Sequence, residues 1–253
     1  MTIRSLAVVK NMGFALLLAL GAGSQAAEIT VLSSNGVKTV LEELGPQFEK
    51  ATQHKLVFRF APAAELKGRI DKGEAFDIAL LTTPLIDDLI KQGKVAAATR
   101  ADIAKSGAGV AIRKGAPKPD ISSADAFKRA LLAAKSIAYV GQGATGANMR
   151  KIFERLGITE EMKAKTKILS GVSAADAVAD GSAELGFTQI SEVLAVAGAE
   201  LAGPLPPELQ IYTVFPAGVS AHAKDAAAAQ SFIKFLTAPA AAPVIKSKGM
   251  EPG

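Results

Sequence analysis

Short apolar runs alternate with stretches of helical periodicity along most of the chain, and this alternation constrains the fold more than any other feature. An apolar run of about 4–8 residues between turn-forming residues is typical of a strand. Helical stretches between such runs are typical of α/β folds. The sequence therefore predicts an α/β fold with strands at residues 29–32, 56–60, 77–81, 109–113, 136–140, 167–169, 184–187 and 211–215.

Apolar residues three and four positions apart mark the intervening helices. Val40, Leu41, Leu44 and Phe48 follow this spacing, and Pro46 among them predicts a bend or an interruption. A proline opens and a glycine closes the helical segment 84–93, and Gly157 closes a helix predicted at 149–156. Further helices are predicted at 223–236 and 238–248.

The first residues have the order of a secretory signal peptide. Arg4 and Lys10 supply positive charge, an apolar run covers residues 12–22, and small residues follow as far as Ala27. The apolar run is shorter than the ~20 residues of a membrane-spanning helix, although an uncleaved anchor is the alternative. We predict a signal peptide at residues 1–27 and a periplasmic mature protein.

Composition argues against several classes of protein. The chain has 29 lysines and arginines against 24 acids, but the lysines are scattered and aromatic residues are few, which argues against nucleic-acid binding. Cysteine is absent, and the two histidines, His54 and His222, are far apart in sequence. We therefore expect no disulfide, no metal site and no cofactor.

Two segments rich in turn-forming residues divide the chain. They are RKGAPKP at 113–119 and GPLPP at 203–207. If the chain crosses between two lobes there, residues 28–113 plus 214–253 form lobe 1, and residues 114–213 form an inserted lobe 2.

Several segments resemble a known family. EITVLSSNGVKTVLEELGPQFEKATQHKLVFRF, AELKGRIDKGEAFDIALLT and the closing FIKFLTAPAAAPVIKSKGMEPG resemble periplasmic molybdate-binding proteins of the type 2 solute-binding fold. The stretches KSIAYVGQGATGANMRKIFERLGI and ELGFTQISEV look like a divergent branch, which also resembles periplasmic aconitate isomerases. The resemblance implies two lobes, each a mixed sheet flanked by helices, with a small anion bound between them.

The family holds its anion with hydroxyls and backbone amides of strand-to-helix loops, where helix N-termini favour negative charge. Four such loops and the segment after the strand at 184–187 are candidates here, although each polar residue could instead cap a helix. The predicted ligand-binding residues are Ser33, Ser34, Asn35, Gly36, Ala63, Ala64, Gly143, Thr145, Gly146, Gly171, Val172, Gln189 and Ser191.

The sequence departs from the molybdate-binding pattern at several of these positions. Gly36 and Ala63 or Ala64 stand where that family usually has serines, and Gln189 stands where it has a tyrosine. A desolvated tetrahedral dianion needs such donors, and each unmade hydrogen bond costs about 1–3 kcal/mol. The ligand is therefore left open between an oxyanion and an organic carboxylate.

Two functions are compatible with these observations. The first is a monomeric binding protein that delivers an anion to an inner-membrane ABC permease, closing two lobes over it. The second is an enzyme resembling aconitate isomerase, which needs one group to remove a proton and return it. Glu65, Tyr139 and His54 are the candidates for that group. Fold alone does not decide between binder and enzyme.

Overall fold

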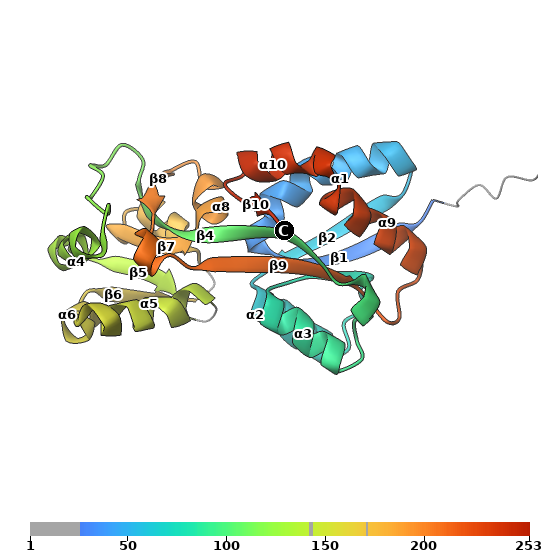
Figure 1. Ribbon diagram of the computed structural model, residues 1–253, viewed down its shortest axis with the longest axis horizontal. Helices are drawn as coiled ribbons and strands as arrows, with labels where there is room; N and C mark the ends of the chain where they lie inside the picture. Colours follow the sequence, from blue (N-terminus) through green and yellow to red (C-terminus); the bar gives the residue numbers. More distant parts are fainter. Residues whose placement is uncertain (1–25, 142–143, 171) are drawn as a thin grey trace, which may run out of the picture.

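Two antiparallel strands, β4 (Ala101–Arg113) and β9 (Tyr212–Val219), run through the middle of the molecule and join its two ends (Figure 1). The computed structural model describes residues 26–141, 144–170 and 172–253. Most of the predicted signal peptide lies outside these residues, as do Gly143 and Gly171.

One mixed sheet holds the molecule together, with the strand order β2-β1-β3-β9-β4-β7-β5-β6. We call β2, β1, β3, β9, β10 and the beginning of β4 the first section. The end of β4 with β7, β8, β5 and β6 is the second section. The remaining strands are β1 (Glu28–Ser34), β2 (Lys55–Ala61), β3 (Ile78–Leu80), β5 (Ile137–Val140), β6 (Thr166–Leu169), β7 (Leu185–Gln189), β8 (Ala199–Pro204) and β10 (Glu251–Pro252).

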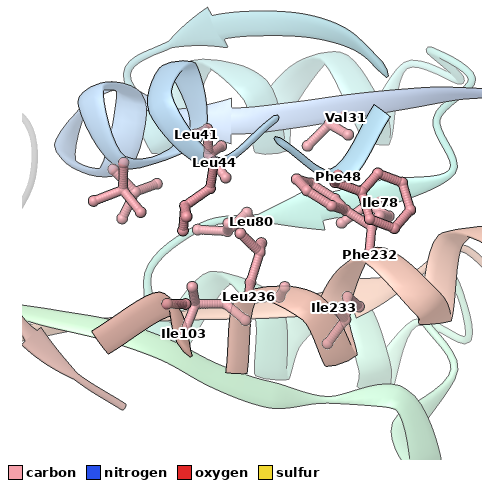
Figure 2. Packing of buried hydrophobic residues seen from close by; sticks show 14 of the residues in the cluster. Val31, Leu41, Leu44, Phe48, Ile78, Leu80, Ile103, Phe232, Ile233 and Leu236 are labelled. Carbon is pink, nitrogen blue, oxygen red and sulfur yellow. The ribbon is translucent and has the colours of Figure 1, made fainter. Parts of the chain in front are cut away.

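Helices cover both faces of the first section because its strands are apolar on both faces. Val31 packs into the cluster under α1 (Lys38–Thr52), α9 (Ala226–Thr237) and α10 (Ala242–Ser247). Its neighbour Leu32 points the other way, towards α2 (Ala63–Asp71) and α3 (Thr83–Lys91). Phe48 of α1 meets Phe232 of α9 with ring centroids 4.8 Å apart (Figure 2).

The second section repeats this three-layer arrangement with its own helices. α4 (Ala124–Ala133), α5 (Ala144–Leu156) and α6 (Thr159–Lys163) supply one cluster, which includes Val110 and Phe127. α7 (Ala174–Ala179) and α8 (Ile190–Leu194) cover the other face, where Ala111 and Val178 lie. Short 3-10 turns complete the chain: η1 (Asn35–Val37), η2 (Ala97–Thr99), η3 (Pro207–Leu209) and η4 (Pro239–Ala241).

The structure confirms the predicted α/β class, and each predicted strand overlaps an observed strand. Three individual elements differ from the expectation. β4 begins at Ala101, well before residue 109, and β8 overlaps the turn-rich segment 203–207. α1 continues through Pro46. The residue before a proline normally leaves the helical region because its Cβ meets the proline ring, and Gly45 has no Cβ.

Successive residues of β4 belong to different hydrophobic clusters. Ala104 belongs to the first section's cluster and Ala108 to the second section's cluster. The division into lobes at residues 113 and 213 stays a prediction. Across the described ranges, no helix combines the length and the apolar character needed to cross a membrane.

Candidate functional site

A cleft of about 270 Å³ opens where the carboxyl ends of the parallel strands of both sections face each other. β1 and β2 run parallel and end at Ser34 and Ala61, while β5 and β6 end at Val140 and Leu169. Ligand sites in α/β sheets lie at such ends. The lining residues are Ser34, Asn35, Pro62, Ala63, Glu65, Thr82, Val140, Thr145, Val172, Ser173, Phe187, Thr188, Gln189, Glu192, Thr213 and Phe215.

Three helices of at least two turns begin at this cleft. α2 and α3 begin beside Pro62 and Thr82, and neither N-cap residue bonds a first-turn N–H through its side chain. α5 brings Thr145, in its first turn, from the second section. The first N–H groups of a helix have no intrahelical acceptor and carry the positive end of the helix dipole. The cleft therefore favours negative charge from both sides.

Gln189 is the most buried amide in the cleft, with 7% of its surface exposed. Its Nε2 donates to the hydroxyls of Thr213 at 2.9 Å and Thr145 at 3.3 Å. Its Oε1 has no hydrogen-bond partner within the described residues. A buried polar atom without a partner costs free energy, so a ligand group that reaches this amide would be stabilised there.

Glu65 is the cleft's acid on the first section. It lies in the first turn of α2, where the helix dipole stabilises a carboxylate. Its Oε1 accepts a hydrogen bond from Arg69 Nη2 at 2.5 Å, one helical turn later. About half of its side chain is exposed, so this carboxylate is both neutralised and hydrated.

Glu192 is the cleft's acid on the second section, and its surroundings differ. It lies in the first turn of α8, partly buried, and the Thr188 hydroxyl donates to its Oε2. Burial raises the pKa of Glu192, although the hydrogen bonds from Thr188 and from the Gln189 N–H act in the opposite direction. No charged side chain is among the groups that shift it in the part of the chain the structure describes.

Several predicted ligand residues line the cleft together: Ser34, Asn35, Ala63, Thr145, Val172 and Gln189. Ala64 lines the wider mouth outside it. The other predicted residues that the structure describes lie behind the surface. Ser33 is fully buried, and a Cβ on Gly146 would meet the Val140 carbonyl oxygen at 2.4 Å. Ser191 donates its hydroxyl to the Gly36 carbonyl at 2.8 Å, which joins the two sections behind the cleft.

Two of the three predicted proton-transfer candidates lie away from the cleft. Tyr139 is 3% exposed inside the second section's core, where burial raises its pKa despite the Arg150 guanidinium. His54 precedes β2, at the end of the strands opposite the cleft, and its Nδ1 accepts from the Ala27 N–H at 3.0 Å. A seven-residue strand separates it from the cleft edge, about 20 Å at the usual rise.

Sequence reasoning missed several residues of the cleft: Thr82, Thr188, Glu192, Thr213, Phe187 and Phe215. The signal for Thr82 was available, since it follows a buried strand and precedes a proline-initiated helix. The sequence signal for Thr188 and Glu192 was weaker. Both lie near Gln189 in the sequence, but only the fold shows that their side chains face the cleft.

The mouth of the cleft is apolar on the second section. Ile168 and Val172 keep 67% and 49% of their surfaces exposed there, and Tyr212, at the start of β9, keeps 53% at the same mouth. Exposed apolar surface beside a polar pocket is typical of a binding site. Among the described residues, no three histidine or acidic side chains gather as a metal site would require.

Sequence comparison finds relatives of known activity. The family model for bacterial extracellular solute-binding proteins matches residues 29–251. An aconitate isomerase from a Pseudomonas species is 35% identical over 230 residues, covering 88% of this chain and 87% of that protein. The molybdate-binding protein ModA of Azotobacter vinelandii is 31% identical over 256 residues, covering 92% and 96%.

Structure comparison gives the same picture for the fold. The solved periplasmic molybdate-binding protein of Azotobacter vinelandii superposes with a TM-score of 0.75 at 21% identity. The superposition covers 89% of this chain and 99% of that one. The mixed sheet flanked by helices is thus the periplasmic-binding-protein fold that the resemblance implied.

Proposed function

The chain belongs to the bacterial extracellular solute-binding protein family, and from this premise we propose that it captures a small organic carboxylate. The single observation that carries the proposal is the convergence of α2, α3 and α5 on one cleft from both sections. The family match also confirms the resemblance stated from the opening and closing segments of the sequence.

Uncharged hydrogen-bond donors recognise the negative charge of the ligand. No lysine or arginine appears among the described residues that line the cleft. Backbone N–H groups at helix N-termini and the hydroxyls of Ser34, Thr82 and Thr145 take that role. Such donors fit an anion that enters without its water.

Apolar lining favours a carboxylate with a carbon skeleton over a tetrahedral oxyanion. Val140, Phe187 and Phe215 face the cleft beside the polar groups, and the methyl group of Ala63 lines it as well. A small oxyanion gains nothing from apolar surface. A carbon chain that covers this surface removes it from water, which contributes ~25 cal/mol of binding free energy per Å² buried.

The mechanism we propose is closure of the two sections around the ligand, with β4 and β9 as the connecting strands. Closure brings the exposed Ile168 and Val172 towards the first section. The family description supports a location outside the cytoplasm, and the order of residues 1–27 supports the periplasm. Delivery by a monomer to an ABC permease completes the proposal.

A melting experiment tests the ligand class. A carboxylate at about 1,000 times its dissociation constant adds ~4 kcal/mol to the free energy of unfolding. For a protein of this size that raises the melting temperature by about 8–16 °C. The panel contains di- and tricarboxylates, molybdate, tungstate, sulfate and phosphate. A response to neutral sugars or amino acids alone would refute anion binding.

A matched pair of variants locates the site. Asn35 is exposed in the cleft, whereas Gln47 is exposed on α1 and bonds only to its own helix. Asn35→Ala should reduce the ligand-induced shift, and Gln47→Ala should leave it unchanged. Equal shifts in both variants would place the ligand elsewhere.

We also propose a second function, isomerisation of aconitate. It is supported by the 35%-identical aconitate isomerase and by a cleft acid, Glu192, that no cation neutralises among the described residues. Purified protein incubated with trans-aconitate should then form cis-aconitate. If wild-type protein forms none, the binding function stands alone.

A further inference from the structure

Resting on that second function, we propose that Glu192 is the catalytic residue that removes a proton from an unsaturated polycarboxylate and returns it. The proposal replaces Glu65, Tyr139 and His54, the residues that the sequence suggested. It is carried by the position, anchoring and charge environment of Glu192.

Position is the first argument. Glu192 lines the cleft beside Thr188 and Gln189, on the section that also provides the apolar residues Val172 and Phe187. A substrate held through its carboxylates by the N-termini of α2 and α3 would direct its carbon chain towards this side. A proton-transfer group must stand within hydrogen-bond reach of the reacting carbon.

Anchoring is the second argument. The Thr188 hydroxyl and the Gln189 N–H both bond to the Glu192 carboxyl. Thr188 itself is fixed in β7, with 4% of its surface exposed. An ionised carboxylate has about four acceptor positions, so two bonds orient it and leave others for substrate.

The charge environment is the third argument. α8 packs against β4, β7, β8 and η1, and β7 and η1 contain no ionisable side chain. The ionisable side chains of β4 and β8 are engaged elsewhere: Asp102 with Arg100, Lys105 with Glu251, Arg113 with the Ala179 carbonyl, and Glu200 with Lys118. Glu65, across the cleft, is bonded to Arg69.

This setting suits an acid that must lose and regain a proton in one catalytic cycle. Burial raises the pKa of Glu192 above its ordinary value, which favours keeping the proton on the carboxyl between its removal from the substrate and its return.

The chemistry balances without an oxidant or a cofactor. The Glu192 carboxylate takes a proton from the methylene group of the substrate, and the C–H electron pair enters the adjacent double-bond system. The developing negative charge spreads onto the substrate carboxylate, where helix N–H groups stabilise it. Glu192 then returns the proton to the other end of the three-carbon system, and the double bond has moved by one carbon.

The decisive experiment measures conversion of trans-aconitate to cis-aconitate by wild type and Glu192→Gln. We expect a loss of about 10²–10⁴-fold in kcat, with the trans-aconitate-induced melting shift retained. Glu161→Gln, an exposed acid on α6 that lines none of the cleft, is the matched control and should keep full activity.

Variants of Thr188 test the role of Glu192 through the pH–rate profile, which would not change if Glu192 had only a structural role. Removing its hydroxyl in Thr188→Val removes a bond that lowers the pKa of Glu192, so the acid limb of the pH–rate profile should shift to higher pH. Thr188→Ser keeps a hydroxyl and should keep the wild-type limb. These variants also keep the proposal testable if Glu192→Gln does not fold.

Three outcomes would overturn the proposal. They are a Glu192→Gln variant within a few-fold of wild type, loss of activity in Glu65→Gln instead, and absence of conversion by wild type. In the last case the carboxylate-induced melting shift would persist, which separates failure of the catalytic proposal from failure of the binding function.

Discussion

On the first section, the acid that reaches the cleft is bonded to an arginine on its own helix; on the second, no charged side chain among the described residues shifts the pKa of the corresponding acid. Glu65 and Arg69 form an exposed ion pair, whereas Glu192 is partly buried against Thr188 and Gln189. The second section also carries the buried Gln189 Oε1, which has no hydrogen-bond partner in the part of the chain that the structure describes. The acid of the first face is thus paired within the protein, whereas the second face has a carboxyl and an amide oxygen that a ligand could engage.

The same contrast extends beyond the cleft. On the first section, Lys67 bonds to Asp71 and Asp88, and Lys94 also bonds to Asp71. These bonds raise the pKa of Lys67 and lower those of Asp71 and Asp88. The second section keeps Ile168 and Val172 exposed at the mouth instead. Binding should therefore change the second section more.

The largest expected effect on stability comes from a test of whether the two sections unfold independently. Phe232 lies in the first section's core and Phe127 in the second's, both fully buried. Replacing either with alanine should cost about 3–5 kcal/mol. Because β4 contributes to both cores and pairs with β9 along its first half, we expect one cooperative denaturant transition that both variants weaken. Two separated transitions, each shifted by one variant, would show independent folding units.

A smaller effect is expected where the sections touch behind the cleft. A Cβ on Gly36 would meet the Phe215 ring at 2.5 Å, and the Gly36 carbonyl accepts the Ser191 bond. Gly36→Ala should cost about 1–3 kcal/mol through overpacking.

Gly68, in α2, is the matched control for this substitution. A Cβ there would meet nothing within 4 Å, so Gly68→Ala should stabilise the helix by ~1 kcal/mol. Chemical denaturation of both variants measures the difference. An equal response at the two positions would contradict the close packing at Gly36.

These contacts explain what the sequence revealed and what it did not. The apolar runs located the strands well where they are continuous, as at residues 29–32 and 136–140. The start of β4 was missed because Asp102, Lys105 and Ser106 interrupt its pattern, and its pairing with β9 joins residues more than a hundred positions apart. β8 was missed because Gly203 and Pro204 read as a turn.

The candidate site shows the same limit. Loop position and residue type pointed to Ser34, Thr145 and Gln189, which the structure brings into one cleft. They pointed to Glu65 and missed Glu192, because no helix was predicted after the strand at 184–187. The distinction depends on burial and on the presence of Arg69, and only the fold decides both.

The pH dependence of stability tests the second section's acid directly. Burial raises the pKa of Glu192 above its ordinary value of 4.5, so the folded state favours its protonated form. The contribution of protonated Glu192 to the free energy of unfolding is fully present below pH 4.5 and is lost as the pH rises through the folded-state pKa. Glu192→Gln should therefore match wild type at low pH and become relatively more stable as the pH rises. A difference independent of pH would show that Glu192 titrates normally.

The smallest expected effect belongs to the first section's acid. Glu65 and Arg69 are four residues apart on α2 and both half-exposed, and such pairs contribute about 0.2–0.5 kcal/mol. Glu65→Gln should cost no more than ~1 kcal/mol, including its interaction with the helix dipole. A double-mutant cycle with Arg69→Gln isolates the pair, and high salt should abolish its coupling. Coupling above ~1 kcal/mol that persists in salt would mean that Glu65 is desolvated like Glu192. The contrast between the two faces of the cleft would then have to be abandoned.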